Sequence, residues 1–265
     1  MSGTAAPNRI IVAADWHGNT TWAWQVISQA RELLADEDQR VILHLGDFGI
    51  WPGLDGEDYL AEVSEALDEA DAGLWFVDGN HEDFDQLTAA LAKSGMRAPI
   101  PVWTAVGNRI SWLPRGHRWE WHGRTWLALG GAVSVDRAIR VKENLGWWPE
   151  EEITDEQEAA VVAGGPADVM VTHDCPAGVV HAFGPRPAEW AETDLARSER
   201  HAQRLQRVTD AVQPSHLMHG HLHMAYQRVC DFGYGPVEVT GLDRDGGRGP
   251  NWAVLDVKSM TWEVP

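Results

Sequence analysis

Five short apolar runs in this chain of 265 residues end directly on side chains that can bind cations or move protons. Carboxylates, imidazoles and one amide gather in these places. Such a mixture suits Mn, Fe or Zn better than Ca, and it holds too many ligands for a single ion. The pattern predicts a site for more than one divalent metal, built from Asp15-Trp16-His17-Gly18, Gly46-Asp47, Asp78-Gly79-Asn80-His81-Glu82, His173-Asp174 and Gly220-His221-Leu222-His223.

The apolar runs themselves predict strands that are covered on both faces, because their apolar residues are nearly continuous rather than alternating. Ligand sites of open α/β sheets lie beyond the carboxyl ends of the strands. We therefore expect the five polar segments to meet at one rim. The predicted strands span residues 9–14, 40–45, 73–77, 167–172 and 215–219, and helices are expected at 20–34, 59–69, 84–94 and 187–212.

The rest of the chain is also rich in strand signals, which favours an α/β fold with two packed β-sheets flanked by helices. Turn signals at Pro114–Gly116 and His122–Gly123 predict an antiparallel meander of residues 109–113, 118–121 and 125–129. Later strands are expected at 226–229, 237–240, 252–257 and 261–264. We interpret residues 1–265 as a single domain with a substrate-facing insertion at 130–152, because irregular segments of that length are often functional.

The charge balance restricts the class of partner. There are 21 Lys and Arg against 40 Asp and Glu, a net charge of −19, which argues against an extended nucleic-acid surface or an anionic membrane surface. Chemistry on phosphate would need its own local positive charge. No apolar run reaches membrane-spanning length, residues 1–7 lack a secretory signal pattern, and two cysteines suggest no disulfide framework. We expect a cytoplasmic protein.

In this order, the motifs DWHG, GD, GNHE, H and GHLH resemble the calcineurin-like binuclear metallophosphoesterase superfamily, over a range from Asp15 to His223. The resemblance implies an α/β/β/α sandwich and two divalent metals, Mn(2+) first and Fe or Zn as alternatives. A hydroxide bridging the two metals would attack phosphorus, and His81 would assist the leaving oxygen. It implies that Asp15, His17 and His223 hold one metal, that Asp47 bridges both, and that Asn80, His173 and His221 hold the other.

One departure from the family concerns the segment after Gly46-Asp47. The Ser/Thr protein phosphatase branch carries Asp-Arg-Gly there, whereas this chain reads GDFGIWPG, with Ile50 and Trp51. His81 then needs another orienting carboxylate, and the phosphate needs another arginine, for which planar bidentate contact suits the side chain. The candidates are Asp78, Asp83 or Asp55 for the carboxylate, and Arg140 or Arg137 for the arginine.

The function implied is hydrolysis of a phosphate ester, and the partner implied is a phosphorylated substrate whose class, monoester or diester, stays open. Alternatives are a nuclease or phosphodiesterase acting on nucleic-acid ends or nucleotides, a Ser/Thr protein phosphatase, or a non-catalytic scaffold. A scaffold would be expected to lose ligands, whereas every ligand position is filled here.

Other polar residues have simpler interpretations. Asp174 is expected to support a metal-binding histidine or to cap its loop, and Trp147 and Trp148 to lie in the core or to wall a substrate cleft. A helix start or solvated face is expected at 150–152, with a capped helix at 154–158. Cys175, His44, His216 and His219 are expected to be structural, and solvent exposure is expected for His117, His122, His181 and His201.

Overall fold

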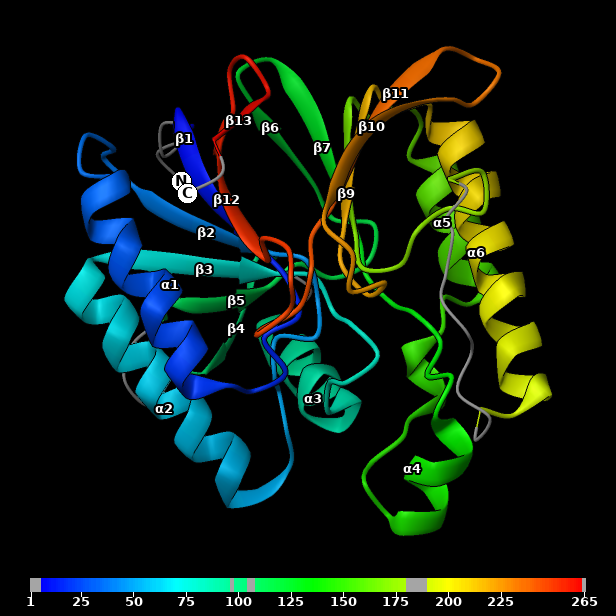
Figure 1. Cartoon of the computed structure of the whole chain (residues 1–265), viewed down its shortest axis with the longest axis horizontal. Helices are drawn as coiled ribbons and strands as arrows, with labels where there is room; N and C mark the ends of the chain where they lie inside the picture. The colour runs from blue at the N-terminus through cyan, green and yellow to red at the C-terminus, as the bar shows by residue number, and fades with distance from the viewer. Residues whose placement is uncertain (1–5, 96–97, 104–107, 180–189, 264–265) are drawn as a thin grey trace.

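Two mixed β-sheets lie face to face, and helices cover the outer side of each sheet (Figure 1). The computed structural model describes residues 6–95, 98–103, 108–179 and 190–263. The first sheet has seven strands in the order β13-β12-β1-β2-β3-β5-β4, and the second has six in the order β10-β11-β9-β8-β7-β6. The predicted α/β class with two packed sheets is confirmed.

The first sheet is parallel at its centre, where β1, β2, β3 and β5 run in one direction. All side chains of β1 and β2 after the first residue are buried, because helices cover one face and the second sheet covers the other. Antiparallel strands close both edges. Its strands are β1 (Arg9–Ala13), β2 (Arg40–His44), β3 (Ala72–Phe76), β4 (Ile100–Trp103), β5 (Ile110–Trp112), β12 (Trp252–Asp256) and β13 (Thr261–Glu263).

The second sheet repeats this plan. Strands β7, β8, β9 and β11 are parallel, while β6 and β10 are antiparallel edges. The carboxyl ends of β8 and β9 therefore point the same way, as those of β1, β2 and β3 do in the first sheet. Its strands are β6 (Arg118–Trp121), β7 (Arg124–Leu129), β8 (Val169–Thr172), β9 (His216–His219), β10 (Tyr226–Asp231) and β11 (Pro236–Gly241).

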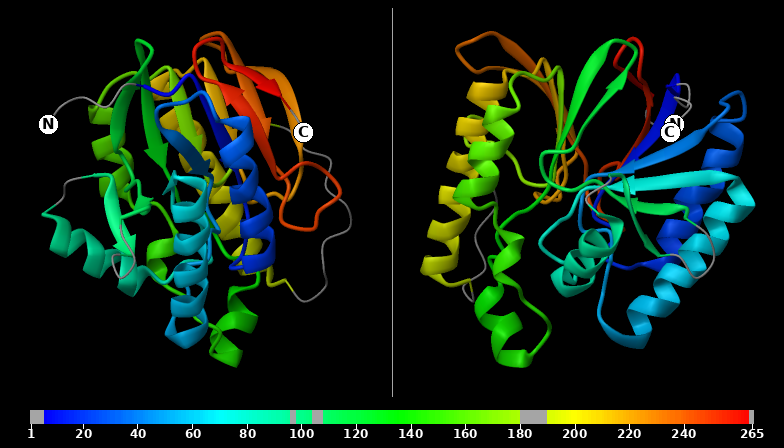
Figure 2. Two further views of the ribbon diagram at one scale, coloured as in Figure 1. Left: turned by 90° about the vertical axis from the view of Figure 1, so that its left-hand side faces the viewer. Right: turned by 180° about the vertical axis from the view of Figure 1, so that it is seen from behind.

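Helices pack on the two outer faces (Figure 1 and Figure 2). Helices α1 (Thr20–Leu33), α2 (Gly53–Ala70) and α3 (Phe84–Ser94) share a core with the first sheet, and α5 (Asp155–Ala163) and α6 (Glu192–Val212) share one with the second. Local sequence sets the helix starts, since Asn19, Asp83 and Thr154 each accept a backbone N–H at the first turn. A third core lies between the sheets and contains Ile10, Val12, Leu43, Trp126, Val169 and Met218.

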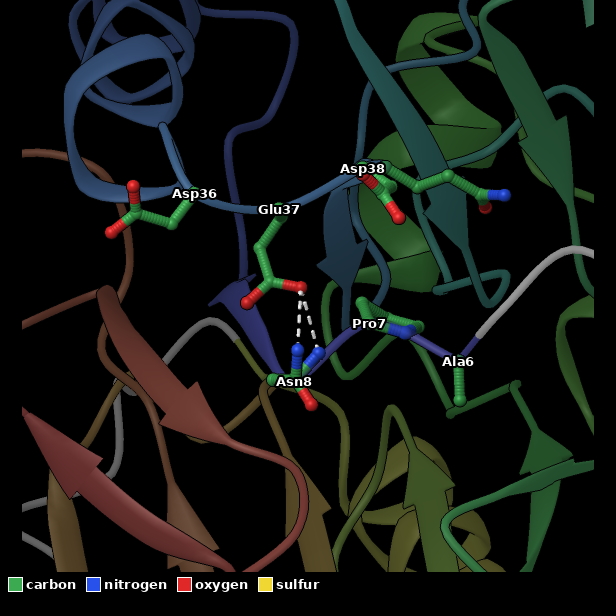
Figure 3. A pocket seen from close by; sticks show the side chains of 7 residues that line it. Ala6, Pro7, Asn8, Asp36, Glu37 and Asp38 are labelled. Atoms are coloured by element: carbon green, nitrogen blue, oxygen red, sulfur yellow. Dashed lines mark hydrogen bonds between the residues drawn. The ribbon is translucent and has the colours of Figure 1, made fainter.

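The end of β1 where the chain enters the strand is tied to the loop before β2. The backbone N–H of Asn8 donates to the Glu37 carboxylate at 2.8 Å (Figure 3), and the backbone N–H of Arg9 donates to it at 3.1 Å. This anchor lies at the opposite end of β1 from the polar residues that follow the strand. None of the helices in the described ranges is long and apolar enough to cross a bilayer.

The structure differs from the sequence predictions in three places. Two strands of the predicted antiparallel meander, β6 and β7, do pair around the turn at His122–Gly123, but β5 joins the first sheet parallel to β3 and the chain then crosses at Pro114–Gly116 to the second sheet. Strand β4 was not predicted. The segment 130–152 is not wholly irregular, since it contains α4 (Arg137–Glu143) and a short 3-10 helix, η1 (Pro149–Glu151). Residues 187–189 of the long predicted helix and residue 264 of the last strand lie outside the described residues.

Candidate metal centre

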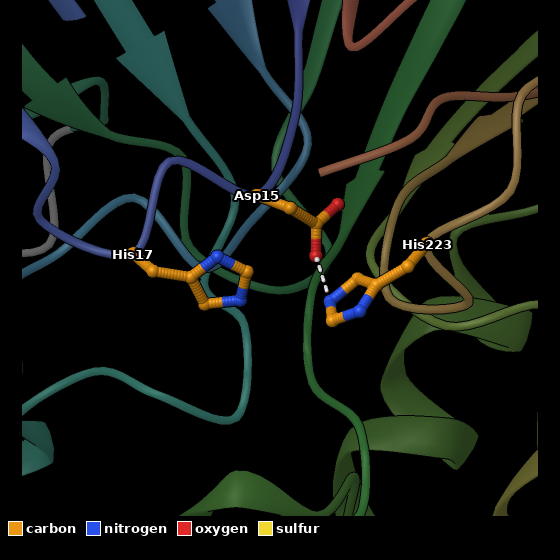
Figure 4. Close-up of side chains that lie close together, drawn as sticks. All are labelled: Asp15, His17 and His223. Atoms are coloured by element: carbon orange, nitrogen blue, oxygen red, sulfur yellow. Dashed lines mark ion pairs between the residues drawn. The ribbon is translucent and has the colours of Figure 1, made fainter. Parts of the chain in front are cut away.

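The loops that follow β1 and β9 bring together three side chains that could hold a metal ion. The ligand atoms of Asp15, His17 and His223 lie within 4.8 Å of one another. The carboxylate and the two rings point toward a common space (Figure 4), and His223 Nε2 lies 3.5 Å from Asp15 Oδ1. Because β1 belongs to the first sheet and β9 to the second, this group joins residues from both sheets.

A second group of three forms beside the first. The ligand atoms of Asp47, His173 and His221 also lie within 4.8 Å of one another. They follow β2, β8 and β9, so this group too draws on both sheets. Asn80, which follows β3, joins it through Oδ1, 3.2 Å from His173 Nε2. The structure thus brings together all seven side chains that the resemblance implied as ligands.

The Asp47 carboxylate lies between the two groups. Its Oδ2 is 3.4 Å from Nε2 of His17, in the first group, and its Oδ1 is 3.4 Å from Nε2 of His173, in the second. The backbone N–H of His81 donates to Oδ1 at 2.9 Å and holds the carboxylate in this position. One oxygen therefore faces each group, an arrangement in which a carboxylate can contact two cations.

Two of the histidines have partners that turn a nitrogen lone pair inward. His173 Nδ1 lies 2.7 Å from the carbonyl oxygen of Leu45, which can only accept, so Nδ1 carries a proton and Nε2 is the nitrogen that can bind a cation once it has lost its own proton. His17 Nδ1 lies 3.2 Å from Asp245 Oδ1, and Asp245 also accepts from Asn19 at 2.7 Å. Metal-binding histidines are commonly held in this way.

The backbone at these residues is in an unusual conformation. A positive φ in a residue other than glycine costs about 1–3 kcal/mol and tends to occur at functional sites. Five of the seven side chains have it, with φ values of 52°, 47°, 53°, 62° and 50° for Asp15, His17, Asp47, His221 and His223. Neighbouring contacts must therefore hold these loops in shape.

Close backbone packing is one of those contacts. A Cβ atom on Gly79 would lie 2.1 Å from Asp47 Oδ1, and one on Gly220 would lie 2.2 Å from Asp15 Oδ2. Only glycine leaves room for the carboxylates there. Glu82 supplies a second contact, because its buried carboxylate accepts the backbone N–H groups of residues 48, 49 and 50, directly after Asp47.

The negative charges of the carboxylates at this centre favour the binding of cations. Burial lowers the pKa of His173 and of His17, but the nearby carboxylates, chiefly that of Asp47, outweigh burial and raise the two pKa values to about 10 and about 9. Burial raises the pKa of Asp47, but His173 and its other neighbours hold it well below its usual range. In the absence of ions, these carboxylates therefore favour the protonated form of both rings. Carboxylate, imidazole and amide donors in this arrangement fit two divalent ions of borderline softness.

The sequence profile of calcineurin-like phosphoesterases matches residues 8–225, most of the chain. The chain belongs to the calcineurin-like phosphoesterase family. No curated protein matched it. Among solved structures, TT1561 of Thermus thermophilus shares 13% identity over 98% of each chain, with a TM-score of 0.49. A predicted phosphoesterase from Streptococcus pneumoniae shares 13% over 95% of this chain and 84% of its own, with a TM-score of 0.40. Haemophilus influenzae NAD nucleotidase shares 10% over 98% of this chain and 50% of its own, with a TM-score of 0.42.

In this phosphoesterase, His81 lies beside the two groups. Its ring centroid is 5.7 Å from that of His17. Burial lowers the pKa of His81, the charge of Asp47 opposes this, and Arg140 lowers the pKa further. The residue is therefore close to the candidate ligands and also close to a guanidinium.

The expected orienting carboxylates of His81 are engaged elsewhere. Asp78 accepts from Trp112 and Arg115, and Asp83 caps α3. Asp55 lies exposed in the first turn of α2. The prediction that one of these three orients His81 is not met among the described contacts. Besides Asp47, the carboxylate whose charge raises the pKa of His81 is that of Asp136, at the start of α4.

The two arginines proposed for phosphate lie at different depths in this phosphoesterase. Arg140 is buried, and its Nη1 donates to the carbonyl oxygen of Asn80 at 3.0 Å and to Ser134 and Glu151. Arg137 is about one-third exposed, donates to Asp194 at 2.8 Å and lies over the ring of Trp147. Only Arg140 therefore contacts the candidate metal centre directly.

Two polar residues expected at the surface are buried. His201 on α6 is 3% exposed, and its Nδ1 lies 2.7 Å from Asp174 Oδ2. Glu151 is 1% exposed and pairs with Arg140, so residues 150–152 are not wholly a solvated face. The predicted exposure of His201 was wrong, and of the two alternatives for 150–152 the helix start is the one that the structure favours, through η1. In both cases a tertiary partner, invisible in local sequence, compensates the burial.

Other expectations hold. Asp174 accepts the backbone N–H of Cys175, so it caps its loop as well as contacting His201. Cys175, His44 and His219 are buried, His122 is exposed, His117 is only partly exposed, and His181 lies outside the described residues. Sequence reasoning missed Asp245, which follows β11 in the run Asp243-Arg244-Asp245-Gly246-Gly247. Two aspartates beside paired glycines were the only local signal.

Proposed function

We propose that this phosphoesterase uses two divalent ions to hydrolyse a phosphate ester. Asp15, His17 and His223 would hold one ion, and Asn80, His173 and His221 the other, with Asp47 contacting both. The observation that carries the proposal is the position of the Asp47 carboxylate. Its Oδ2 lies 3.4 Å from Nε2 of His17, and its Oδ1 lies 3.4 Å from Nε2 of His173. We propose Mn(2+) as the first candidate, with Fe or Zn as alternatives.

The ions would supply positive charge for the phosphoryl oxygens and a water of lowered pKa between them. The protein has to hold the ligands of the two ions in the right positions. Loops with strained backbone hold the ligands before any ion binds, and the partners of His17 and His173, which are Asp245 and the Leu45 carbonyl, keep a ring nitrogen directed inward. Such preorganisation limits rearrangement during the reaction.

His81 would move a proton at the leaving oxygen. Its backbone N–H is fixed by Asp47, so its ring stays beside the ligands. A ring nitrogen that donates a proton as the P–O bond breaks typically contributes about 10²–10⁴ in rate. Asp47 and Asp136 favour the protonated ring, while burial and Arg140 oppose it.

Arg140 and Arg137 would add the positive charge of protein side chains to that of the ions, near the substrate phosphate. Arg140 Nη1 donates to the carbonyl oxygen of Asn80 at 3.0 Å, so its guanidinium would lie next to a ligand of the second ion. Replacing Arg140 with Lys keeps the charge but removes the planar fork, and turnover or substrate binding should fall. Unchanged kinetics in Arg140→Ala would mean that the segment 130–152 serves the structure alone.

The filled ligand positions favour an enzyme over a scaffold, and the net charge of −19 favours a small phosphorylated substrate over a long nucleic acid. We propose no membrane partner. Both cysteines are free thiols, which agrees with the reducing cytoplasm proposed for the protein.

The test is a panel of aryl and alkyl phosphate monoesters and diesters, measured after loading with Mn, Fe or Zn beside elemental analysis. We expect about two ions per chain and activity on one ester class. His81→Ala should keep both ions, lose more rate with an alkoxide than with a nitrophenolate, and differ in this from His216→Ala, a control on β9. Fewer than one ion per chain in the wild type would refute the proposal.

A further inference from the structure

The two ends of the Asn80 side-chain amide have opposite chemistry. Its oxygen accepts hydrogen bonds and binds cations, while its nitrogen carries two protons and does neither. In the structure Oδ1 faces His173 Nε2 at 3.2 Å, and Nδ2 donates to the hydroxyl oxygen of Ser134 at 3.1 Å. A rotation of half a turn would present the nitrogen to the ion. Something must select the orientation in which the oxygen faces the centre.

Ser134 has the hydrogen bonds to make that selection. Its hydroxyl has one proton, which it donates to Glu151 Oε2 at 2.6 Å. Arg140 Nη1 donates to the same hydroxyl oxygen at 2.6 Å. With its proton directed to Glu151, the hydroxyl can only accept from Asn80. The amide must therefore turn its nitrogen toward Ser134, and its oxygen then faces His173.

Burial makes it costly for any of these four side chains to lose its hydrogen-bond partner. Exposed fractions are 3% for Asn80, 2% for Ser134, 5% for Arg140 and 1% for Glu151. Bulk water is therefore not at hand to replace a lost partner, and an unpaired buried polar group costs about 1–3 kcal/mol. Arg140 also donates to the Asn80 carbonyl at 3.0 Å and to Glu151 Oε1 at 3.1 Å, so it fixes both the backbone of Asn80 and the acceptor of the Ser134 proton.

We propose that Ser134, held by Glu151 and Arg140, is a positioning residue that turns the amide oxygen of Asn80 toward the second metal. This inference rests on the proposed function, because it requires Asn80 to be a ligand through Oδ1. It gives the segment 130–152 a role beside any contact with substrate, since Ser134, Arg140 and Glu151 all belong to it. Through Ser134, this segment orients the proposed ligand Asn80.

The test compares Ser134→Ala with Ser134→Thr in the full-length protein. Dissociation constants for Mn(2+) and Zn(2+) are measured by competition with a chromophoric chelator, and stoichiometry by elemental analysis. Ser134→Ala should weaken the second ion by about 10–100-fold and leave the first within about threefold, the range for losing an outer partner of a ligand. Ser134→Thr keeps a hydroxyl on the same atom and should restore most of the affinity.

An Asn80→Asp background separates orientation from structural support. Both oxygens of Asp are equivalent, so a half-turn of the side chain changes nothing. Adding Ser134→Ala to Asn80→Asp should therefore change the affinity for the second ion less than about threefold. Thermal unfolding of each variant, without ions, reports the purely structural loss. Equal losses of affinity in the two backgrounds would overturn the inference.

A further variant distinguishes failure of the inference from failure of the proposed function. Asn80→Ala should lose the second ion. If it keeps both ions at wild-type affinity, Asn80 is not a ligand and the proposed metal centre is wrong. If Asn80→Ala loses an ion while Ser134→Ala binds both as tightly as the wild type, the proposed function stands and the role of Ser134 is refuted.

Discussion

Asp245→Asn should weaken metal binding although Asp245 is not among the proposed ligands. The carboxylate accepts from two donors, His17 Nδ1 at 3.2 Å and Asn19 Nδ2 at 2.7 Å. Asn at position 245 offers one oxygen and one NH₂ group, so it can accept from only one of them in the same geometry. If the NH₂ group faces His17, the ring proton moves to Nε2, and the nitrogen lone pair no longer faces Asp47.

The structure sets the expected size of this effect. A hydrogen bond to a charged group contributes about 1.5–3 kcal/mol. The side chains of His17 and Asp245 are 23% and 16% exposed, so solvent screens the interaction in part. We therefore take the lower end, about 1.5–2 kcal/mol, which corresponds to about 10–30-fold in the dissociation constant of the ion held by His17.

The assay is calorimetric titration of ion-free protein with Mn(2+) and Zn(2+). Asp256→Asn is a matched control, because Asp256 accepts from Ser259 in a turn between β12 and β13 and makes no contact with the centre in the described residues. We expect the first ion to weaken in Asp245→Asn alone. Wild-type affinity for both ions in Asp245→Asn would refute the reasoning that His17 needs this partner.

Three further predictions concern the same centre. Asp47→Asn should weaken both ions together and lower turnover by at least about 100-fold, measured by elemental analysis and steady-state kinetics; two tightly bound ions with full activity would contradict the bridging role. Burial lowers the pKa values of His17 and His173, but the carboxylates raise them to about 9 and about 10 without ions, so ions must displace protons. Metal affinity should therefore increase with pH up to about 9, with proton release visible in buffers of different ionisation enthalpy; a pH-independent affinity would exclude this. Gly79→Ala should displace Asp47 and release both ions, because its Cβ would lie 2.1 Å from Asp47 Oδ1, whereas Gly73→Ala, with its nearest neighbour at 3.9 Å, should retain them.

The strands and the polar residues that follow them could be predicted from sequence because both signals are local. Strand β2 has three consecutive apolar residues at its centre, and Gly46 and Asp47 follow it after a single residue, Leu45. The sheet to which a strand belongs is not a local property. Strand β5 has the pattern of the strands after it, yet it pairs with β3, which lies more than thirty residues earlier.

The polar residues that support the centre were harder to predict for the same reason. His201 lies on a helix rich in Arg and Glu, where exposure is the usual outcome, and only the contact with Asp174 shows why it is buried. Glu151 sits in an acidic run and becomes a buried partner of Arg140 through folding. The candidate ligands belong to short sequence motifs. The residues that hold them in place come from other parts of the chain, which only folding brings close.

Each ligand group takes members from both sheets, and this gives the ions a mechanical consequence. His223 and Asp15 face each other across the seam between the sheets, and so do His173 and Asp47. An ion bound by such a pair would cross-link the two sheets, a constraint that the two free cysteines do not supply. At a free concentration one thousand times its dissociation constant, one ion would add about 4 kcal/mol to the free energy of unfolding. The lifetime of the folded chain would then follow the supply of metal in its surroundings, and a chelator would loosen the sandwich as well as stop the reaction.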